Sequence, residues 1–487
     1  MPTHQQMRQF AFPSEEIDDV EAVRLLGLKQ PLPTITLKAP QLLGVYFGLT
    51  TPRFIMSLDK GCGKTVTYLA IMYLAEVDRL LILCRNSSKM AQRRELLRHF
   101  PKWKNSWVFV EGQDKAKRKK LWESDNKVFI CTYDTFKADM GARAKSSGRI
   151  CPKWCDTVAM VQDEWHNYLR RRQSGFFTFM KGLNPERLIL SSGSAAGKGP
   201  QDLWAALHIC APKVFRGYWP YVKTFCETVA GAFSQSEIVG PKNIPGWRNT
   251  VSGYVFHRKK DLKDYPPKTR QALEVEMPTW QKKIHDDLQK ELMAEVGDNL
   301  IIAPNAMAAT MKIRQFMVCP KFIDESLGWG AGLEGILADV QESELTHWVI
   351  STPFTGPIPW IEAFFKANGY HTERLTGADK LDADGMERVI ARWTKNGGPI
   401  IQTIKYAESY ELPAARIMYM LGYEYSHDQN SQAEDRIHRD IRVTPHPVDI
   451  YYVKHIGSYD ERVVEILSTG ADNAHALTNM SLKEVFQ

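Results

Sequence analysis

Short apolar runs alternate with amphipathic stretches in two parts of this chain. In the first part the runs are RFIMSL at 53–58, RLLILC at 79–84, KVFICT at 127–132, TVAMVQ at 157–162 and RLILSS at 187–192. Each run is about the length of a strand and ends in polar or small residues. Continuous apolar runs of this kind are typical of strands buried on both faces of a parallel sheet. The pattern predicts an α/β fold whose helices cover both faces.

A second alternating segment begins near residue 345 and contains the runs HWVIST, GPIIQT, ARIMYML and VDIYYV. Between the two parts, helical patterns and aromatic residues dominate. We therefore expect two α/β domains joined by a helical insert. The predicted boundaries are 1–35 for a polar, loosely ordered lead-in, 36–199 for the first domain, 200–330 for the insert and linker, and 331–487 for the second domain.

Composition adds little to this picture. The chain has 487 residues and a net charge of +7, from 63 basic and 56 acidic residues, which permits a polyanionic partner without requiring one. No apolar run of about 18 residues occurs, so we expect neither a signal peptide nor a membrane span. The eight cysteines lack the spacing of a zinc site. They are expected to be unpaired thiols in a reducing compartment.

The segment FIMSLDKGCGKTVTYLAIMYL suggests a phosphate-binding loop. An apolar run leads into Gly61, Cys62, Gly63, Lys64 and Thr65, and an apolar-periodic stretch follows. A strand, a glycine-rich turn and a helix together bind phosphate through backbone N–H groups. Lys64 would hold the β- and γ-phosphates of a nucleotide, and the Thr65 hydroxyl would ligate Mg²⁺. The alternative is a tight turn with a surface lysine.

An acidic pair follows the apolar run of the segment VAMVQDEWHNY. Asp163 would hold Mg²⁺ through water, and Glu164 would orient and deprotonate the attacking water. His166 would report the nucleotide state to neighbouring motifs. We expect the pair on a strand adjacent to that of the phosphate loop. A strand that ends in solvated charges is the alternative.

The segment NSQAEDRIHRDIR carries a third candidate group. Gln432, Arg436 and Arg439 are spaced i, i+4 and i+7, which predicts that they share one face of a helix. Two arginines on one face suit the charge that develops on a transferring γ-phosphate. A solvated charged face is the alternative when the segment is taken alone.

Taken in order, these segments resemble the motifs of superfamily 2 helicases. The first motif of that superfamily does not require the earlier glycine of the longer phosphate-loop pattern, whose place Leu58 takes here. The segments that carry the resemblance are LKAPQLLGV, LDKGCGKT, LLILCRNSSKMAQRRELLRHF, DEWH, LSSGSAAGKGPQDLW, WVISTPFTGPIPWIEAFFKANGYHTERLTG and SQAEDRIHR.

Two further segments point to one branch of that superfamily. LWAALHICAPKVFRGYWPYVKTFC resembles the helical insert of the Swi/Snf-like ATP-dependent DNA translocases, and FHRKKDLKDYPPKT resembles their Arg-Arg-Lys…Leu-Pro-Lys signature. Two departures stand out. Ser409-Tyr410-Glu411-Leu412 takes the place of the usual Gly-x-Asn-Leu, which puts the coupling between hydrolysis and DNA contact in question. Ile441-Arg442 replaces a Gly-Gln pair.

The resemblance implies two RecA-like P-loop NTPase domains that each supply half of an ATP site. It assigns catalysis to Lys64, Asp163, Glu164, Arg436 and Arg439, ATP binding to Gln41, Gly61, Cys62, Gly63, Lys64 and Thr65 with Gln41 reading adenine, and Mg²⁺ to Thr65 and Asp163. It assigns coupling between motifs to His166, Ser192, Gly193, Ser194 and Gln432.

The function implied by the resemblance is that of a motor. The chain would hydrolyse ATP, with Mg²⁺ as cofactor, while moving on duplex DNA held mainly through its phosphates. Its compactness resembles phage and bacterial members, which implies DNA replication, recombination or repair in a bacterial or phage-infected cytoplasm. Protein partners are not predicted, and no nucleosome is implied.

Two other functions remain open at this point. A strand-separating DNA or RNA helicase of the same superfamily would carry a wedge hairpin or a strand-separation domain, and no pattern here indicates either. A nucleic-acid-binding regulator that uses ATP as a switch without turnover would have lost Lys64, Glu164 or the arginines. All of these residues are present.

Overall fold

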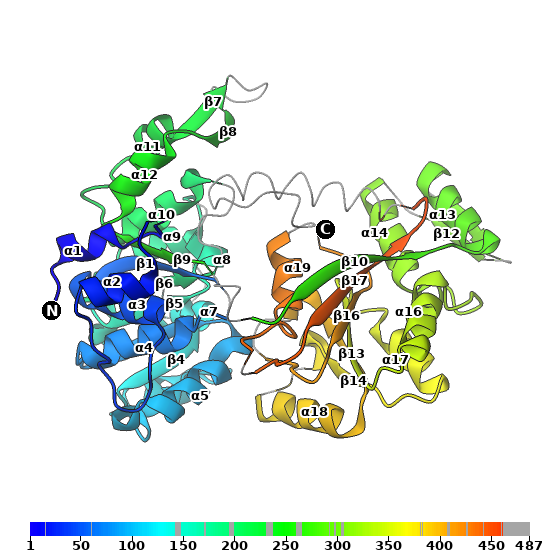
Figure 1. The fold of residues 1–487 in the computed structure, drawn as a ribbon, viewed down its shortest axis with the longest axis horizontal. Coiled ribbons are helices and arrows are strands. Elements are labelled where there is room, and N and C mark those ends of the chain that lie inside the picture. The colour runs from blue at the N-terminus through cyan, green and yellow to red at the C-terminus, as the bar shows by residue number, and fades with distance from the viewer. Residues whose placement is uncertain are drawn as a thin grey trace. The chain divides into compact units, whose positions relative to one another are not determined.

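The computed structural model of the chain is shown in Figure 1. It describes residues 1–460 except 15, 60, 142–147, 170–171, 194–198, 230–236, 260–264, 292, 297–298, 303–305, 380, 382, 407–409, 425–426, 442 and 459. The chain divides between residues 260 and 261 into two compact units. We call Met1–Lys260 unit 1 and the part from Asp261 onward unit 2. The range 200–330, predicted as insert and linker, contributes to both.

Unit 1 is built on a seven-stranded sheet of order β3-β4-β2-β5-β6-β1-β9, in which every neighbouring pair is parallel. Its strands are β1 (Arg53–Leu58), β2 (Leu80–Cys84), β3 (Trp107–Phe109), β4 (Val128–Thr132), β5 (Ala159–Asp163), β6 (Leu188–Ser192) and β9 (Val255–Arg258). All five apolar runs of the first segment form strands. The prediction of a parallel α/β sheet is confirmed for this unit.

Two apolar clusters cover the two faces of this sheet. Ile55 of β1 packs in one cluster, whereas its neighbours Phe54 and Met56 pack in the other. Successive side chains of a strand point to opposite faces, so both faces of β1 are buried.

The helices of unit 1 are α1 (His4–Gln9), α2 (Asp19–Leu25), α3 (Ala39–Thr50), α4 (Lys64–Leu74), α5 (Lys89–His99), α6 (Lys115–Trp122), α7 (Tyr133–Asp139), α8 (His166–Leu169), α9 (Gly175–Met180), α10 (Pro200–Cys210), α11 (Tyr218–Phe225) and α12 (Ile244–Val251), with a hairpin of β7 (Cys226–Val229) and β8 (Glu237–Pro241).

The predicted lead-in of residues 1–35 contributes helices α1 and α2 to unit 1. Met7 and Ala22, on α1 and α2, are buried in the core of unit 1. Arg258 at the end of β9 donates from Nε to Asp19 Oδ1 at 2.6 Å. Sparse apolar side chains and one ion pair thus attach this segment to unit 1.

The basic segment KAKRKK at 115–120 is helical. It lies within helix α6, which Asp114 caps by accepting from the backbone N–H of Ala116. Arg118 is buried and donates from Nη2 to Asp139 Oδ1 at 2.7 Å. One of the six residues is therefore structural.

Unit 2 contains a six-stranded parallel sheet of order β10-β17-β16-β13-β15-β14. The strands are β10 (Lys268–Val275), β13 (His347–Thr352), β14 (Glu373–Leu375), β15 (Gly398–Thr403), β16 (Ile417–Met420) and β17 (Val448–His455). The four predicted runs of the second segment form β13, β15, β16 and β17. Strand β10 was not predicted and lies in the range expected to be helical, because its polar positions hide the strand pattern.

The helices of unit 2 surround this sheet and an added hairpin. They are α13 (Thr279–Glu291), α14 (Ala306–Val318), α15 (Pro320–Ile323), α16 (Ala331–Glu342), α17 (Ile358–Ala367), α18 (Ala383–Asn396) and α19 (His427–Glu434), and the hairpin pairs β11 (Met293–Val296) with β12 (Asn299–Ile302). Trp348, Ile350 and Ile401 lie in the apolar core of the unit.

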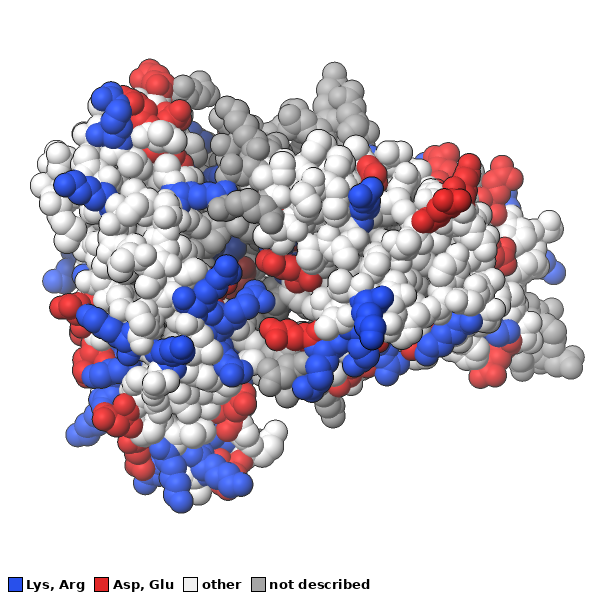
Figure 2. All heavy atoms as spheres, turned by 60° about the horizontal axis from the view of Figure 1, so that its bottom comes forward, with Lys and Arg blue, Asp and Glu red and all other residues white. Residues whose placement is uncertain are grey.

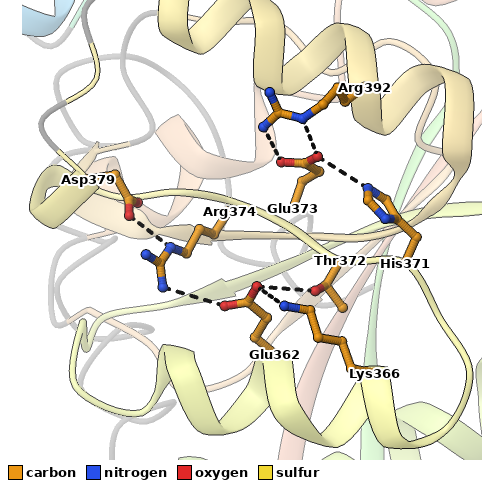
Figure 3. A network of polar contacts seen from close by, with 8 residues as sticks. All are labelled: Glu362, Lys366, His371, Thr372, Glu373, Arg374, Asp379 and Arg392. Atoms are coloured by element: carbon orange, nitrogen blue, oxygen red, sulfur yellow. Dashed lines mark hydrogen bonds and ion pairs between the residues drawn. The ribbon is translucent and has the colours of Figure 1, made fainter.

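A polar network holds the edge strand β14 in place (Figure 3). Arg392 of α18 donates from Nε and Nη2 to the two carboxylate oxygens of Glu373, at 2.7 and 2.8 Å. Arg374 pairs with Asp379 at 2.8 Å. Paired charges on an edge strand oppose unwanted pairing with other strands.

None of the eight cysteines, all within the described residues, forms a disulfide. Among the helices described, none has the length and apolar character needed to cross a lipid bilayer.

Candidate nucleotide site

The predicted phosphate loop connects β1 to helix α4, which begins at Lys64. Gly63 precedes the helix with a positive φ of 77°, a conformation that favours glycine. A Cβ atom at this position would lie 2.0 Å from Gln41 Nε2. The backbone conformation favours glycine, and a larger residue would also displace the Gln41 side chain. The loop presents the start of an 11-residue helix, whose first N–H groups suit an anion.

Gln41 lies directly against this loop. Its Nε2 donates to the carbonyl oxygen of Cys62 at 3.2 Å, and its Oε1 accepts from the backbone N–H of Lys38 at 2.9 Å. The side chain thereby joins the start of α3 to the phosphate loop. Its assignment to adenine recognition stays a prediction.

The acidic pair lies at the carboxyl end of β5. The prediction that β5 adjoins the strand of the phosphate loop is wrong, because β6 lies between β5 and β1. Lys64 Nζ nevertheless lies 3.8 Å from Glu164 Oε1. The carboxyl ends of parallel strands share one edge of the sheet, so a single intervening strand still leaves long side chains within reach.

His166 connects this pair to the next predicted motif. Its Nδ1 lies 2.7 Å from Ser192 Oγ and 3.4 Å from Glu164 Oε2. Ser192 Oγ also lies 3.4 Å from Glu164 Oε2. Glu164 has a positive φ of 53°, which is uncommon for a residue with a side chain. The predicted motif residues His166 and Ser192 thus meet at the carboxylate proposed as the base; Gly193 follows Ser192 directly, and Ser194 lies outside the described residues.

Asp163 is buried at the end of β5. Its Oδ2 accepts from Gln92 Nε2 at 3.2 Å, and its backbone oxygen accepts from the Tyr133 hydroxyl at 2.7 Å. Mg²⁺ favours oxygen ligands, takes one or two from the protein and fills the rest with water and phosphate. The carboxylate of Asp163 and the hydroxyl of Thr65, at the start of α4, fit that preference.

The predicted arginine pair belongs to unit 2. Helix α19 ends at Glu434, so the prediction that Gln432, Arg436 and Arg439 share one helical face is wrong. Arg436 lies in the turn after the helix, where its Nε donates to the backbone oxygen of Gln432 at 3.1 Å and its Nη1 to that of Tyr410 at 3.0 Å. These contacts hold the chain in a non-helical turn, so α19 does not continue through Arg436.

The electrostatic setting of the two arginines differs. Burial, together with the charge of Arg439, lowers the pKa of Arg436 to about 10, so the side chain stays charged at neutral pH. Arg439 pairs with Glu411 at 3.5 Å. The backbone N–H of Leu412 donates to the oxygen of Arg436 at 2.9 Å. The divergent segment 409–412, of which Ser409 lies outside the described residues, therefore contacts both arginines directly.

A buried carboxylate that the sequence did not single out anchors the end of α19. Glu434 accepts from Lys268 Nζ at 2.8 Å and Arg270 Nη2 at 2.7 Å on β10, and from the Tyr452 hydroxyl at 2.6 Å on β17. Burial alone would raise the pKa of Glu434, but the two cations hold it well below its ordinary value. Glu434 and its three partners thus attach the end of α19, just before the turn that contains Arg436, to β10 and β17.

The chain is similar in sequence to curated proteins of plants and animals. Probable ATP-dependent DNA helicase CHR23 of Arabidopsis thaliana is 22% identical over 454 residues, covering 84% of this chain and 40% of the relative. The Caenorhabditis elegans homolog of SWI/SNF-related matrix-associated actin-dependent regulator of chromatin subfamily A-like protein 1 is 27% identical over 258 residues, covering 51% and 35%. The chain thus spans less than half the length of either curated relative.

The chain also resembles a solved structure and matches a family model. The Sulfolobus solfataricus SWI2/SNF2 ATPase core in complex with dsDNA is 15% identical, with 94% of this chain and 98% of that chain covered at a TM-score of 0.42. The model of the SNF2-related domain matches residues 50–321, which is more than half of the chain. This match agrees with the Swi/Snf-like resemblance of the motifs. The chain therefore belongs to the family of proteins with an SNF2-related domain.

Proposed function

We propose that the chain is an ATP-dependent motor that hydrolyses ATP to ADP and phosphate while moving on duplex DNA. The observation that carries the proposal is the 3.8 Å approach of Lys64 to Glu164 at the edge of the sheet of unit 1. A cation for phosphate and a carboxylate base meet there beside a helix N-terminus. Membership of the SNF2-related family supports the same activity.

Each residue has a defined part in this mechanism. Lys64 and the N–H groups of the loop bind the β- and γ-phosphates, and Glu164 orients the attacking water and accepts its proton. His166 and Ser192 hold the Glu164 carboxylate. Bound Mg²⁺, held by Thr65 and through water by Asp163, would neutralise charge on the phosphates.

The arginines of unit 2 complete the proposed chemistry. Arg436 and Arg439 add positive charge where the γ-phosphate leaves, which requires the two units to close on the nucleotide. Closure with ATP and opening with ADP would then drive stepwise movement. Gln432 lies on α19 and accepts at its backbone oxygen from Arg436 Nε, and we assign it to coupling.

DNA is the proposed partner because relatives of the chain include an ATP-dependent DNA helicase and a DNA annealing helicase and endonuclease. The described face in Figure 2 carries Lys and Arg interspersed with Asp and Glu. In this proposal, individual Lys and Arg side chains contact the phosphates of the DNA backbone. A phage or bacterial role in replication, recombination or repair, within the cytoplasm, stays a prediction from the sequence.

ATPase assays with duplex DNA, single-stranded DNA and RNA test the proposal. We expect stimulation by duplex DNA to exceed that by single strands, and Lys64→Ala to lose it. Displacement of a triplex strand without separation of the duplex would support translocation. Separation of the duplex would favour the strand-separating helicase instead, and stimulation by RNA alone would overturn the DNA assignment.

A further inference from the structure

A chain of buried polar side chains runs behind the proposed metal-binding carboxylate. Gln92, on α5, donates from Nε2 to Asp163 Oδ2 at 3.2 Å. The hydroxyl of Tyr68, on α4, donates to Gln92 Oε1. Tyr68 is 0% exposed and Gln92 is 1% exposed. Polar groups this deeply buried are kept only when their hydrogen bonds are satisfied.

The series begins close to the phosphate loop. Thr65, at the start of α4, lies three residues before Tyr68 on the same helix. Residues three apart on a helix are neighbours on its surface. Tyr68, Gln92 and Asp163 form one hydrogen-bonded series across α4, α5 and β5. Asp163, one end of this series, is a residue assigned to Mg²⁺.

The donor and acceptor inventory fixes the direction of every bond in this series. An ionised Asp163 only accepts, so Gln92 presents its NH₂ to Asp163 and its carbonyl oxygen to Tyr68. That oxygen only accepts, so the single hydroxyl proton of Tyr68 points to Gln92.

We propose that Gln92 and Tyr68 are positioning residues that orient Asp163 in the Mg²⁺ site of the bound nucleotide. The proposal rests on the proposed function. Outer partners of metal ligands typically change metal affinity by about tenfold to a hundredfold when removed. Gln92 is the junction of the series, because it hydrogen-bonds to both Tyr68 and Asp163.

A second buried glutamine offers a matched control. Gln162 precedes Asp163 on β5 and is 0% exposed. Its Nε2 contacts only the sulfurs of Met160 and Met180, at 3.3 and 3.2 Å, and its Oε1 has no hydrogen-bond partner in the described structure. Gln162→Leu therefore removes an equally buried amide from the same site without touching the series.

The experiment compares Gln92→Leu and Gln162→Leu in the full chain. Binding of a non-hydrolysable ATP analogue is titrated with Mg²⁺ and with excess EDTA, and Mn²⁺ binding in the presence of the analogue is followed by electron paramagnetic resonance. We expect Gln92→Leu to weaken Mg²⁺-dependent binding by about tenfold or more, with binding in EDTA unchanged. Gln162→Leu should match the wild type in every measurement.

Tyr68→Phe keeps the ring and removes the hydroxyl, so it tests the same series if Gln92→Leu fails to fold. It should also lower Mn²⁺ affinity while leaving binding in EDTA unchanged. Normal Mg²⁺ dependence in both variants, or equal losses with and without Mg²⁺, would overturn the proposal. A wild-type chain that bound no nucleotide, or an Asp163→Asn variant without any Mg²⁺ defect, would instead reject the proposed function.

Discussion

The carboxylate of Glu411 lies 3.5 Å from Nε of Arg439. That Nε makes no hydrogen bond within the described part of the chain, so the ion pair is the contact the structure gives it. Glu411 stands where the family motif usually carries asparagine. An anion therefore offsets part of the charge of an arginine proposed to act on the γ-phosphate, and it has to be displaced, or outcompeted, when phosphate arrives.

Glu411→Asn restores the usual residue and removes this competing charge. Exposed or half-exposed ion pairs contribute about 0.2–1 kcal/mol, so we expect ATP turnover to rise by up to about fivefold. Single-turnover hydrolysis with saturating duplex DNA measures the effect. A fall in turnover would show that Glu411 positions Arg439 instead of restraining it.

Arg439→Ala removes the positive charge that is proposed to act on the γ-phosphate. Arginine fingers contribute roughly a thousandfold or more to phosphoryl transfer, so turnover should fall by that order while ATP affinity changes little. Turnover and nucleotide affinity are measured on the same preparation. Lost ATP affinity with normal turnover of the bound fraction would contradict the assigned role.

Salt should weaken the complex with duplex DNA steeply. Binding through phosphates releases counterions, so the logarithm of the affinity falls linearly with the logarithm of the salt concentration. Fluorescence anisotropy on two duplexes of unrelated sequence, measured across a salt series, checks this. Parallel slopes are expected for the two sequences. A flat salt dependence would exclude phosphate-dominated binding.

His257 should make unit 1 sensitive to mild acid. Burial, aided by the charges of Arg258 and Lys259, lowers its pKa from 6.5 to about 4. Between these values the unfolded chain binds a proton that the folded chain does not, so stability is lost as pH falls below 6.5. The loss from pH 7 to pH 5 is about 2 kcal/mol.

Urea unfolding at the two pH values, followed by a probe in unit 1, measures this effect. The variant His257→Gln keeps a group able to hydrogen-bond to Ser57, which lies 3.0 Å from the imidazole Nδ1. It should lose less stability on acidification than the wild type. Equal losses would assign the acid sensitivity to other groups.

Local patterns predicted the strands well, because continuous apolar runs such as 53–58 and 398–403 have few alternatives to a doubly buried strand. They did not predict the order of the strands. Strand β6 lies between β1 and β5 in the sheet. This order depends on pairing between strands far apart in the sequence, and the spacing of the apolar runs does not indicate it. Lys64 still contacts Glu164 because β1 and β5 end at the same edge of the sheet.

The site residues that were missed share one property: they are polar side chains satisfied by distant partners. Gln92 falls on an amphipathic helix as an ordinary polar position, and its burial against Asp163 becomes visible only in three dimensions. Glu434 likewise resembles a solvated charge until β10 brings Lys268 and Arg270 to it. The helical spacing of Gln432 and Arg436 misled for a related reason, since tertiary contacts to Tyr410 ended the helix early.

The pair Lys64 and Glu164 separates a motor from an ATP-dependent switch. Glu164→Gln keeps the size of the side chain but removes the base, so ATP should bind without completing hydrolysis. Lys64→Ala should instead weaken the grip on the phosphates themselves. A motor would lose all movement along DNA in Glu164→Gln while holding ATP and DNA at least as tightly as the wild type.

A switch that needs only bound ATP gives the opposite pattern, with activity kept in Glu164→Gln and lost in Lys64→Ala. Triplex displacement, measured beside ATP binding on both variants, distinguishes the two. The 3.8 Å contact between the residues adds a control, because a neutral glutamine also removes the counter-charge of Lys64. ATP binding by Glu164→Gln should then be as tight as that of the wild type or tighter. Intact displacement by this variant would end the motor interpretation, since movement would no longer depend on hydrolysis.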